Sequence, residues 1–192
     1  MALNLIETML IVDGEIKHKD YHERRMLRSR EDLFKLSHPL NLSEVLDLPT
    51  QGVFRCRVVY NQEVIDVSFS SLTERIFKSF MVVESDIEYS YKFEDRSSIN
   101  LLFDGKEHCD DIIIIKNNLV TDTSIANIGL FLKDTWYTPK YPLLKGTTRQ
   151  RYLDLGIVLE KDLYKDDLYK AEKFVLMNSI LDFHVIENPI FI

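Results

Sequence analysis

Hydrophobic and polar residues follow both strand-like and helix-like patterns in the first half of the chain. Leu5 to Val12 has the composition of a β-strand and ends at Asp13-Gly14, a turn that favours a hairpin with Glu15 to Lys17. Tyr21 to Leu36 is rich in helix-forming residues and has a partial apolar face, which predicts a helix whose first turn Asp20 caps. A short helix, a hairpin and another strand are predicted next, at Ser43 to Leu48, Val53 to Tyr60 with Glu63 to Phe69, and Ile76 to Glu84. This mixture predicts an α+β arrangement.

The second half predicts mostly strands, with two or three short helices. Tyr89 to Phe93 is expected to be extended, and the unbroken apolar run Ile112 to Lys116 predicts a buried strand that turns back at Asn117-Asn118. Helices are expected from Asp95 or Ser97 to Phe103, from Gly146 to Leu155 and near Asp166 to Ala171. The other strands are expected at Leu119 to Asp122, Asn127 to Leu132, Trp136 to Tyr137, Gly156 to Glu160, Lys173 to Asn178 and Phe183 to Glu187. A boundary near Ser85 would give an N-terminal α+β domain (1-84) and a C-terminal strand-rich domain (85-192).

The composition is typical of a soluble globular protein and disfavours several classes of partner. Of the 192 residues, 45% are hydrophobic and 29% are charged, which is enough to form a core without additional cross-links. The net charge of -7, with no dense basic face, disfavours nucleic-acid binding. The apolar runs are far shorter than the roughly 20 residues of a membrane span, and no signal-peptide pattern is present. We therefore expect a cytoplasmic protein without a nucleic-acid or membrane partner.

The two cysteines, Cys56 and Cys109, do not have the spacing of metal ligands. The chain also contains neither a C-x-x-C nor an H-E-x-x-H motif. We therefore expect free thiols, as in a reducing cytosol, and no metal site.

Lys92 is the first residue with candidate chemistry. Tyr89, Tyr91 and Phe93 surround it in the sequence, and burial among aromatic rings could lower the pKa of its amine and favour a nucleophile. An ordinary surface lysine would show the same pattern.

Two further candidates lie in the second half. Gly146-Thr147-Thr148 opens a predicted helix, where backbone N–H groups and the helix dipole favour a phosphate. Asp122 lies just past a buried strand and offers a carboxylate. A simple helix cap and an Asx-type turn are the plainer interpretations of these two features.

Arginines and a serine complete the set of candidates. Arg25, in the first helix, suits a phosphate, although a solvated helix face is the plainer interpretation. Arg57 shares one face of its strand with Arg55 and could bind a substrate carboxylate, or simply be exposed. Ser179 follows the last buried strand.

Taken in order, these segments resemble the class IV aminotransferases, which depend on pyridoxal 5'-phosphate (PLP) and include the D-amino-acid and branched-chain aminotransferases. IETMLIVDGEIKHKDYHERRM is similar to the family's first hairpin and helix start, and YKFEDRS to its lysine segment. DIIIIKNNLVTDTSIANIGLF and WYTPKYPLLKGTTRQRYLDLG are similar to its later strands and phosphate turn. The resemblance is strongest to the 4-amino-4-deoxychorismate lyase branch. It implies a two-domain fold of type IV, with α+β and α/β structure, N-terminally shortened here, and a homodimer.

The resemblance also implies a role for each candidate. Lys92 would be the Schiff-base lysine and the proton carrier, and Asp122 would pair with the pyridine nitrogen. The phosphate would be held by Arg25, by the turn at Gly146, Thr147 and Thr148, and by Ser179. The chain departs from the family in having Asp122 where glutamate is usual, and Lys145 where proline is common.

Three functions remain open on this basis. The first is a lyase that converts 4-amino-4-deoxychorismate into 4-aminobenzoate and pyruvate, for folate synthesis, with Arg57 holding a substrate carboxylate. The second is a D-amino-acid or branched-chain aminotransferase, which would act on a similar small amino-acid-like substrate. The third is a catalytically inactive binding protein of the same fold.

Overall fold

The structure, a computed structural model, describes residues 3–105 and 108–192. The chain divides into two compact units. The first unit comprises Met1–Glu74 and Tyr91–Asp95, and the second comprises Arg75–Ser90 and Arg96–Ile192. This division differs from the boundary expected near Ser85, because β5 (Ser79–Glu84) belongs to the second unit and the residues around Lys92 belong to the first.

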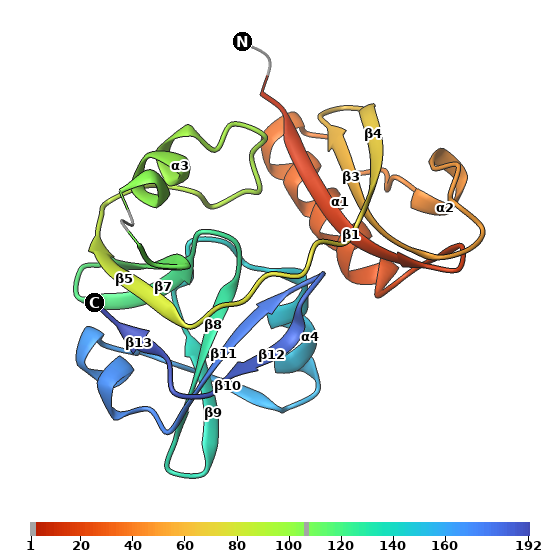
Figure 1. Cartoon of the computed structure of the whole chain (residues 1–192). Coiled ribbons are helices and arrows are strands. Elements are labelled where there is room, and N and C mark those ends of the chain that lie inside the picture. Colours follow the sequence, from red (N-terminus) through yellow and green to blue (C-terminus); the bar gives the residue numbers. More distant parts are fainter. Residues whose placement is uncertain (1–2, 106–107) are drawn as a thin grey trace. The chain divides into compact units, whose positions relative to one another are not determined.

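The first unit is a four-stranded antiparallel sheet with a long helix against it (Figure 1). The strand order is β2-β1-β3-β4. The elements are β1 (Leu5–Val12), β2 (Glu15–Ile16), α1 (Lys19–Phe34), α2 (Leu42–Val45), β3 (Val53–Tyr60) and β4 (Val64–Ser71). Leu5, Met9 and Ile11 alternate along β1 and so share one face of the sheet, where they pack with Met26 of α1. Burial of this face anchors the helix to the sheet.

The start of α1 corrects one expectation from the sequence. Asp20 does not cap the helix, because it already lies in the first helical turn. The N-cap position is occupied by His18 in the left-handed conformation (φ 55), and its side chain makes no capping hydrogen bond. The helix therefore begins two residues earlier than predicted, and no side-chain cap marks its start.

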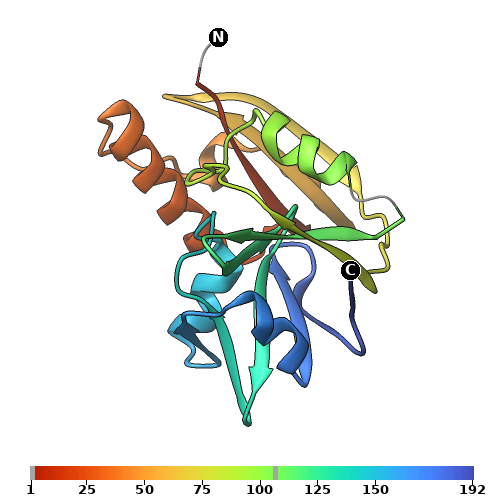
Figure 2. The ribbon, with the colours of Figure 1, turned by 90° about the vertical axis from the view of Figure 1, so that its left-hand side faces the viewer.

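The second unit is built on a nine-stranded mixed sheet. Its main path runs β10-β9-β8-β7-β6-β5-β13, and β11 pairs with both β8 and β12. Figure 2 shows β8 and β9 as a long pair of strands beside β11. Besides β5, the elements are α3 (Ser97–Asp104), β6 (Asp111–Lys116), β7 (Leu119–Thr123), β8 (Asn127–Leu132), β9 (Thr135–Pro139), α4 (Thr147–Asp154), β10 (Val158–Lys161), the 3-10 helix η1 (Lys165–Lys170), β11 (Lys173–Asn178), β12 (Asp182–Ile186) and β13 (Ile190–Phe191).

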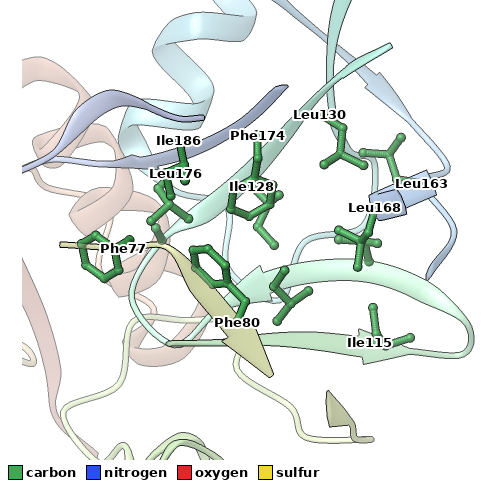
Figure 3. Close-up of a cluster of buried hydrophobic side chains, with 13 residues drawn as sticks. Phe77, Phe80, Ile115, Ile128, Leu130, Leu163, Leu168, Phe174, Leu176 and Ile186 are labelled. Carbon is green, nitrogen blue, oxygen red and sulfur yellow. The ribbon is translucent and has the colours of Figure 1, made fainter. Parts of the chain in front are cut away.

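Aromatic and aliphatic side chains from most of these strands form the core of the second unit (Figure 3). Phe174 of β11 is fully buried, and its ring centroid lies 5.1 Å from that of Phe80 in β5 and 5.5 Å from that of Phe191 in β13. The two-residue strand β13 was not predicted from the sequence. It forms because Phe191 packs on this cluster while its backbone pairs with β5.

None of the helices within the described ranges combines the length and the apolar composition that crossing a membrane requires.

We predict that Phe174→Ala destabilises the second unit by about 3–5 kcal/mol, because it leaves a cavity between two other rings. Urea unfolding can be followed by the fluorescence of Trp136, the chain's one tryptophan, which lies in β9 of the same unit. Leu101→Ala is the matched control, since Leu101 is 75% exposed and its loss should change the stability by less than about 0.5 kcal/mol. Equal unfolding midpoints for the two variants would contradict this account of the core.

Candidate active site

Lys92 lies in a segment that extends the sheet of the first unit. The N–H of Ile6 donates to the carbonyl of Lys92 at 2.8 Å, and the N–H of Glu94 donates to the carbonyl of Asn4 at 2.9 Å. β2 pairs with β1 only at the far end of β1, so the Lys92 segment occupies the part of that edge that β2 leaves open. Hydrogen bonds to a central sheet strand therefore fix the backbone of the lysine.

Side chains hold the same segment in place. The Glu94 carboxylate accepts hydrogen bonds from Asn4 Nδ2 and from Arg57 Nη2, each at 3.0 Å, and the Tyr91 hydroxyl donates to Asp32 Oδ2 at 3.0 Å. Arg57 is 33% exposed, so it is neither buried nor simply projecting into solvent. The structure thus links Arg57, the candidate substrate-binding residue, to the segment that carries Lys92.

Arg25 is buried and makes a two-point ion pair. Its Nε donates to Glu7 Oε1 at 2.7 Å and its Nη2 donates to Glu7 Oε2 at 2.6 Å, while Nδ1 of His22 lies 2.7 Å from Oε2. Glu7 has no exposed surface. Burial alone would raise the pKa of Glu7, but the Arg25 charge and the hydrogen bonds from His22 and Arg25 lower it to about 2.

This arrangement rules out a solvated helix face for Arg25. It also places His22 in a buried contact with the same carboxylate. Glu7 was not among the residues predicted from the sequence. The signal was present, because Glu7 is a carboxylate in an apolar strand, on the same face as Leu5 and Met9, and it therefore needed a buried cation.

Asp122 of β7 is the buried carboxylate of the second unit. Oδ2 accepts the N–H of Leu144 at 2.8 Å, and Oδ1 accepts Nδ2 of Asn127 at 2.6 Å. Burial raises the pKa of Asp122 to about 7, and these hydrogen bonds and the charge of Arg149 oppose that rise. The Asx-type turn considered from the sequence is absent, because Asp122 lies within a strand.

The Gly146 turn opens α4, as the sequence indicated. Gly146 occupies the N-cap position and, having no side chain, makes no side-chain cap. Thr147 and Thr148 in the first turn are buried. The first N–H groups of a helix lack partners within the helix, so this end can bind an anion. Arg149 instead packs inward, and its Nη2 donates to the Pro139 carbonyl and to Glu160, each at 2.7 Å.

Ser179 is half-buried in the turn between β11 and β12. The preceding Asn178 fixes this turn, because its Oδ1 accepts the N–H groups of Ile180 and Leu181 at 2.9 and 2.8 Å. Asn178 Nδ2 also donates to the carbonyl of Ile125, in the turn between β7 and β8, at 3.3 Å. The Ser179 turn is thus tied to the hairpin that carries Asp122.

The candidate residues fall into two sets, one in each unit. Lys92, Arg25 and Arg57 belong to the first unit, and Asp122, the Gly146 turn and Ser179 belong to the second. The first set offers an amine and two cations, and the second offers a buried carboxylate and a helix N-terminus. In the described part of the chain, no group of three or more His, Cys, Asp or Glu side chains could hold a metal ion.

Comparison with known proteins identifies a family model and a relative that are similar to this chain. The family model for class IV amino-transferases matches residues 104–186. An uncharacterized protein of Haemophilus influenzae is 36% identical over 182 residues, which span 92% of this chain and 97% of that protein.

Solved structures are also similar. A Haemophilus somnus protein, described as a candidate 4-amino-4-deoxychorismate lyase, is 32% identical and matches 94% of this chain and 97% of its own, with a TM-score of 0.85. A hypothetical aminotransferase from Mycobacterium tuberculosis in a PLP-bound form is 16% identical and matches 95% of this chain and 80% of its own, with a TM-score of 0.80. At 16% identity, the second comparison establishes a shared fold only.

The low pKa of Glu7 predicts how acid destabilises the first unit. Its pKa falls from 4.5 to about 2 on folding, so the unfolded chain binds the proton first as the pH drops. The wild type should therefore lose on the order of 3 kcal/mol between about pH 5 and pH 2 from this group alone. Glu7→Gln should lack this component and, with the buried Arg25 guanidinium deprived of its carboxylate, should be less stable by about 3–5 kcal/mol at neutral pH.

The measurement is urea unfolding at a series of pH values, followed by far-ultraviolet circular dichroism. Glu15→Gln is the control, because the Glu15 side chain is 77% exposed and its ion pair is with the surface residue Lys17. If Glu7→Gln and the wild type lose stability in parallel as the pH falls, the Glu7 ion pair is not the cause.

Proposed function

Because the chain belongs to the class IV aminotransferase family of enzymes, with their fold of type IV, we propose that it is a PLP-dependent 4-amino-4-deoxychorismate lyase. The enzyme would convert 4-amino-4-deoxychorismate into 4-aminobenzoate and pyruvate, a step in folate synthesis. The observation that carries this choice is the 32% identity, over nearly the whole of both chains, to the Haemophilus somnus protein described as a candidate lyase.

The second unit has groups suited to both ends of PLP. The buried Asp122 carboxylate would pair with the pyridine nitrogen, and a protonated nitrogen beside it would favour its ionised form. The uncapped start of α4 at Gly146, with the hydroxyls of Thr147 and Thr148, would hold the phosphate. Ser179 would add a further phosphate contact. The second unit thus offers an acceptor suited to the pyridine nitrogen and donors suited to the phosphate.

The first unit would supply the cations and the amine. Glu7 holds the guanidinium of Arg25 in one orientation, which would leave the cation pre-organised for the cofactor phosphate. The sheet hydrogen bonds at Ile6 and Asn4 hold the Lys92 backbone, so its side chain would start from a fixed point.

PLP supplies, when bound, an electron sink for a carbon that loses a proton. Lys92 would hold the cofactor through its amine. Lys92 would also take the proton from the substrate carbon that bears the amino group, and would return a proton to the departing three-carbon unit. 4-Aminobenzoate and pyruvate together contain every atom of the substrate, so the reaction needs no oxidant and no keto-acid acceptor.

Arg57 would bind a carboxylate of the substrate. It is partly exposed and its Nη2 contacts Glu94, while a guanidinium has five N–H donors in all. Glu94 would thus orient Arg57 while the remaining donors meet the substrate.

We also propose a cytoplasmic homodimer. Cys56 and Cys109 are both buried free thiols, which is compatible with a reducing compartment.

The lysine assignment predicts a covalent product that can be located. After incubation with PLP and reduction with borohydride, peptide mass spectrometry should find the cofactor on Lys92. Lys92→Ala should bind no cofactor covalently and should lose at least about 1,000-fold in turnover. Lys170→Ala is the control, because Lys170 is 66% exposed and its ion pair is with Asp167 of the same short helix. Labelling of any other lysine in place of Lys92 would reject the assignment.

The proposed reaction predicts its own products. The enzyme given 4-amino-4-deoxychorismate alone should release 4-aminobenzoate and pyruvate in equal amounts, measured by chromatography and by a coupled assay. If instead turnover requires 2-oxoglutarate or pyruvate as an acceptor, the chain is an aminotransferase. If PLP adds covalently to no lysine of the wild type, the chain is an inactive binding protein of this fold.

A further inference from the structure

Asn127 has no role in the function proposed above, yet it contacts two of the groups that function needs. It is the first residue of β8, and it is the register partner of Asp122 through which β7 joins β8. Its side chain is buried with an exposed fraction of 5%. The amide Nδ2 donates to Asp122 Oδ1 at 2.6 Å and to the carbonyl of Leu144 at 2.7 Å. Both N–H groups of the amide are therefore used.

The amide oxygen of Asn127 explains why residue 146 is glycine. A Cβ atom at Gly146 would overlap Oδ1 of Asn127 and would lie 3.2 Å from its Cγ. The backbone does not require glycine, since φ of -71° and ψ of 150° are open to any residue. Glycine is needed because the Asn127 amide packs directly against the turn.

Leu144 closes the set of contacts. Its carbonyl accepts from Asn127, and its own N–H donates to the second oxygen of Asp122 at 2.8 Å. The carboxylate, the amide and the chain leading into Gly146 therefore restrain one another. The charged side chain that also acts on Asp122 is Arg149, from α4.

We propose that Asn127 is a positioning residue that sets the separation between the Asp122 carboxylate and the Gly146 turn. This role rests on the proposed function, because the Asp122 carboxylate and the Gly146 turn would contact opposite ends of one rigid cofactor. A ligand of fixed length gains from both contacts only if their spacing matches its own. Asn127 supplies that match by hydrogen-bonding the carboxylate and packing against the turn, without touching the reacting atoms.

The first test is a titration of Asp122 in the cofactor-free, 13C-labelled protein by NMR, from about pH 5 to about pH 9. Asn127→Ala removes a donor to the ionised carboxylate, so the pKa of Asp122 should rise above its value of about 7. Asn100→Ala, at an exposed position of α3 in the same unit, should leave that pKa unchanged. A residue that merely fills space would not shift the titration.

The second test compares dissociation constants for PLP and for pyridoxal, which lacks the phosphate. In the wild type and in Asn100→Ala, PLP should bind far more tightly than pyridoxal. Asn127→Ala should reduce that ratio by about tenfold, because the ring and the phosphate can no longer be held together without strain. If Asn127→Ala leaves both the ratio and the pKa of Asp122 at their wild-type values, the proposal is overturned.

A double-mutant cycle tests the packing independently of any ligand. Gly146→Ala alone should destabilise the second unit because its methyl group meets the Asn127 amide. In the Asn127→Ala background the same change should cost much less. Strict additivity of the two changes would refute direct contact. Asn127→Ser, too short to reach both partners, replaces Asn127→Ala if the latter does not fold. If neither aldehyde binds the wild type, the proposed function fails, while the titration and this cycle still decide the role of Asn127.

Discussion

The carboxylates of Glu7 and Asp122 are both buried, and each must be stabilised by donors from other segments of its unit. Glu7 is paired with the guanidinium of Arg25 and the ring of His22, and its pKa falls to about 2. Asp122 is held mainly by neutral N–H donors, and its pKa rises to about 7. Coulombic attraction compensates desolvation in the first case and does not do so in the second. The first unit thus fixes the cation of Arg25, while the second keeps the Asp122 carboxylate, whose protonation responds to a nearby charge.

The same requirement for partners explains how the candidate site is built. Glu7 orients Arg25 because a buried carboxylate accepts two parallel N–H bonds from one guanidinium. Asp122 draws Leu144 toward it, and so brings the chain into position just before the Gly146 turn. The Lys92 segment adds to the open edge of β1 because an unpaired strand edge presents unsatisfied backbone groups. Each functional candidate is therefore held by a hydrogen-bonding need of the fold itself.

Many elements of the fold were predictable from the local pattern of the sequence. The strand-like composition of Leu5 to Val12, the apolar run in β6 and the glycine-led start of α4 each correspond to elements of the structure. The family resemblance and the fold of type IV are confirmed by the comparisons. The helix cap at Asp20 was wrong, because His18 in the left-handed conformation occupies the N-cap position. The strand β13 was missed, because its pairing with β5 depends on contacts with distant residues.

By itself, the sequence determined the kinds of elements, their order, the family and the chemical identity of the candidate groups, because these depend on residue type and short-range spacing. Only the tertiary structure decided that Glu7 pairs with Arg25, that Asn127 lies between Asp122 and Gly146, and that Lys92 joins the first unit. The reason is that all three involve contacts across the folded chain, driven by burial of polar groups. The separation is 18 residues for Glu7 and Arg25, 5 and 19 residues for Asn127 with Asp122 and Gly146, and about 86 residues for Ile6 and Lys92. No local pattern encodes which distant partner a buried polar group will find.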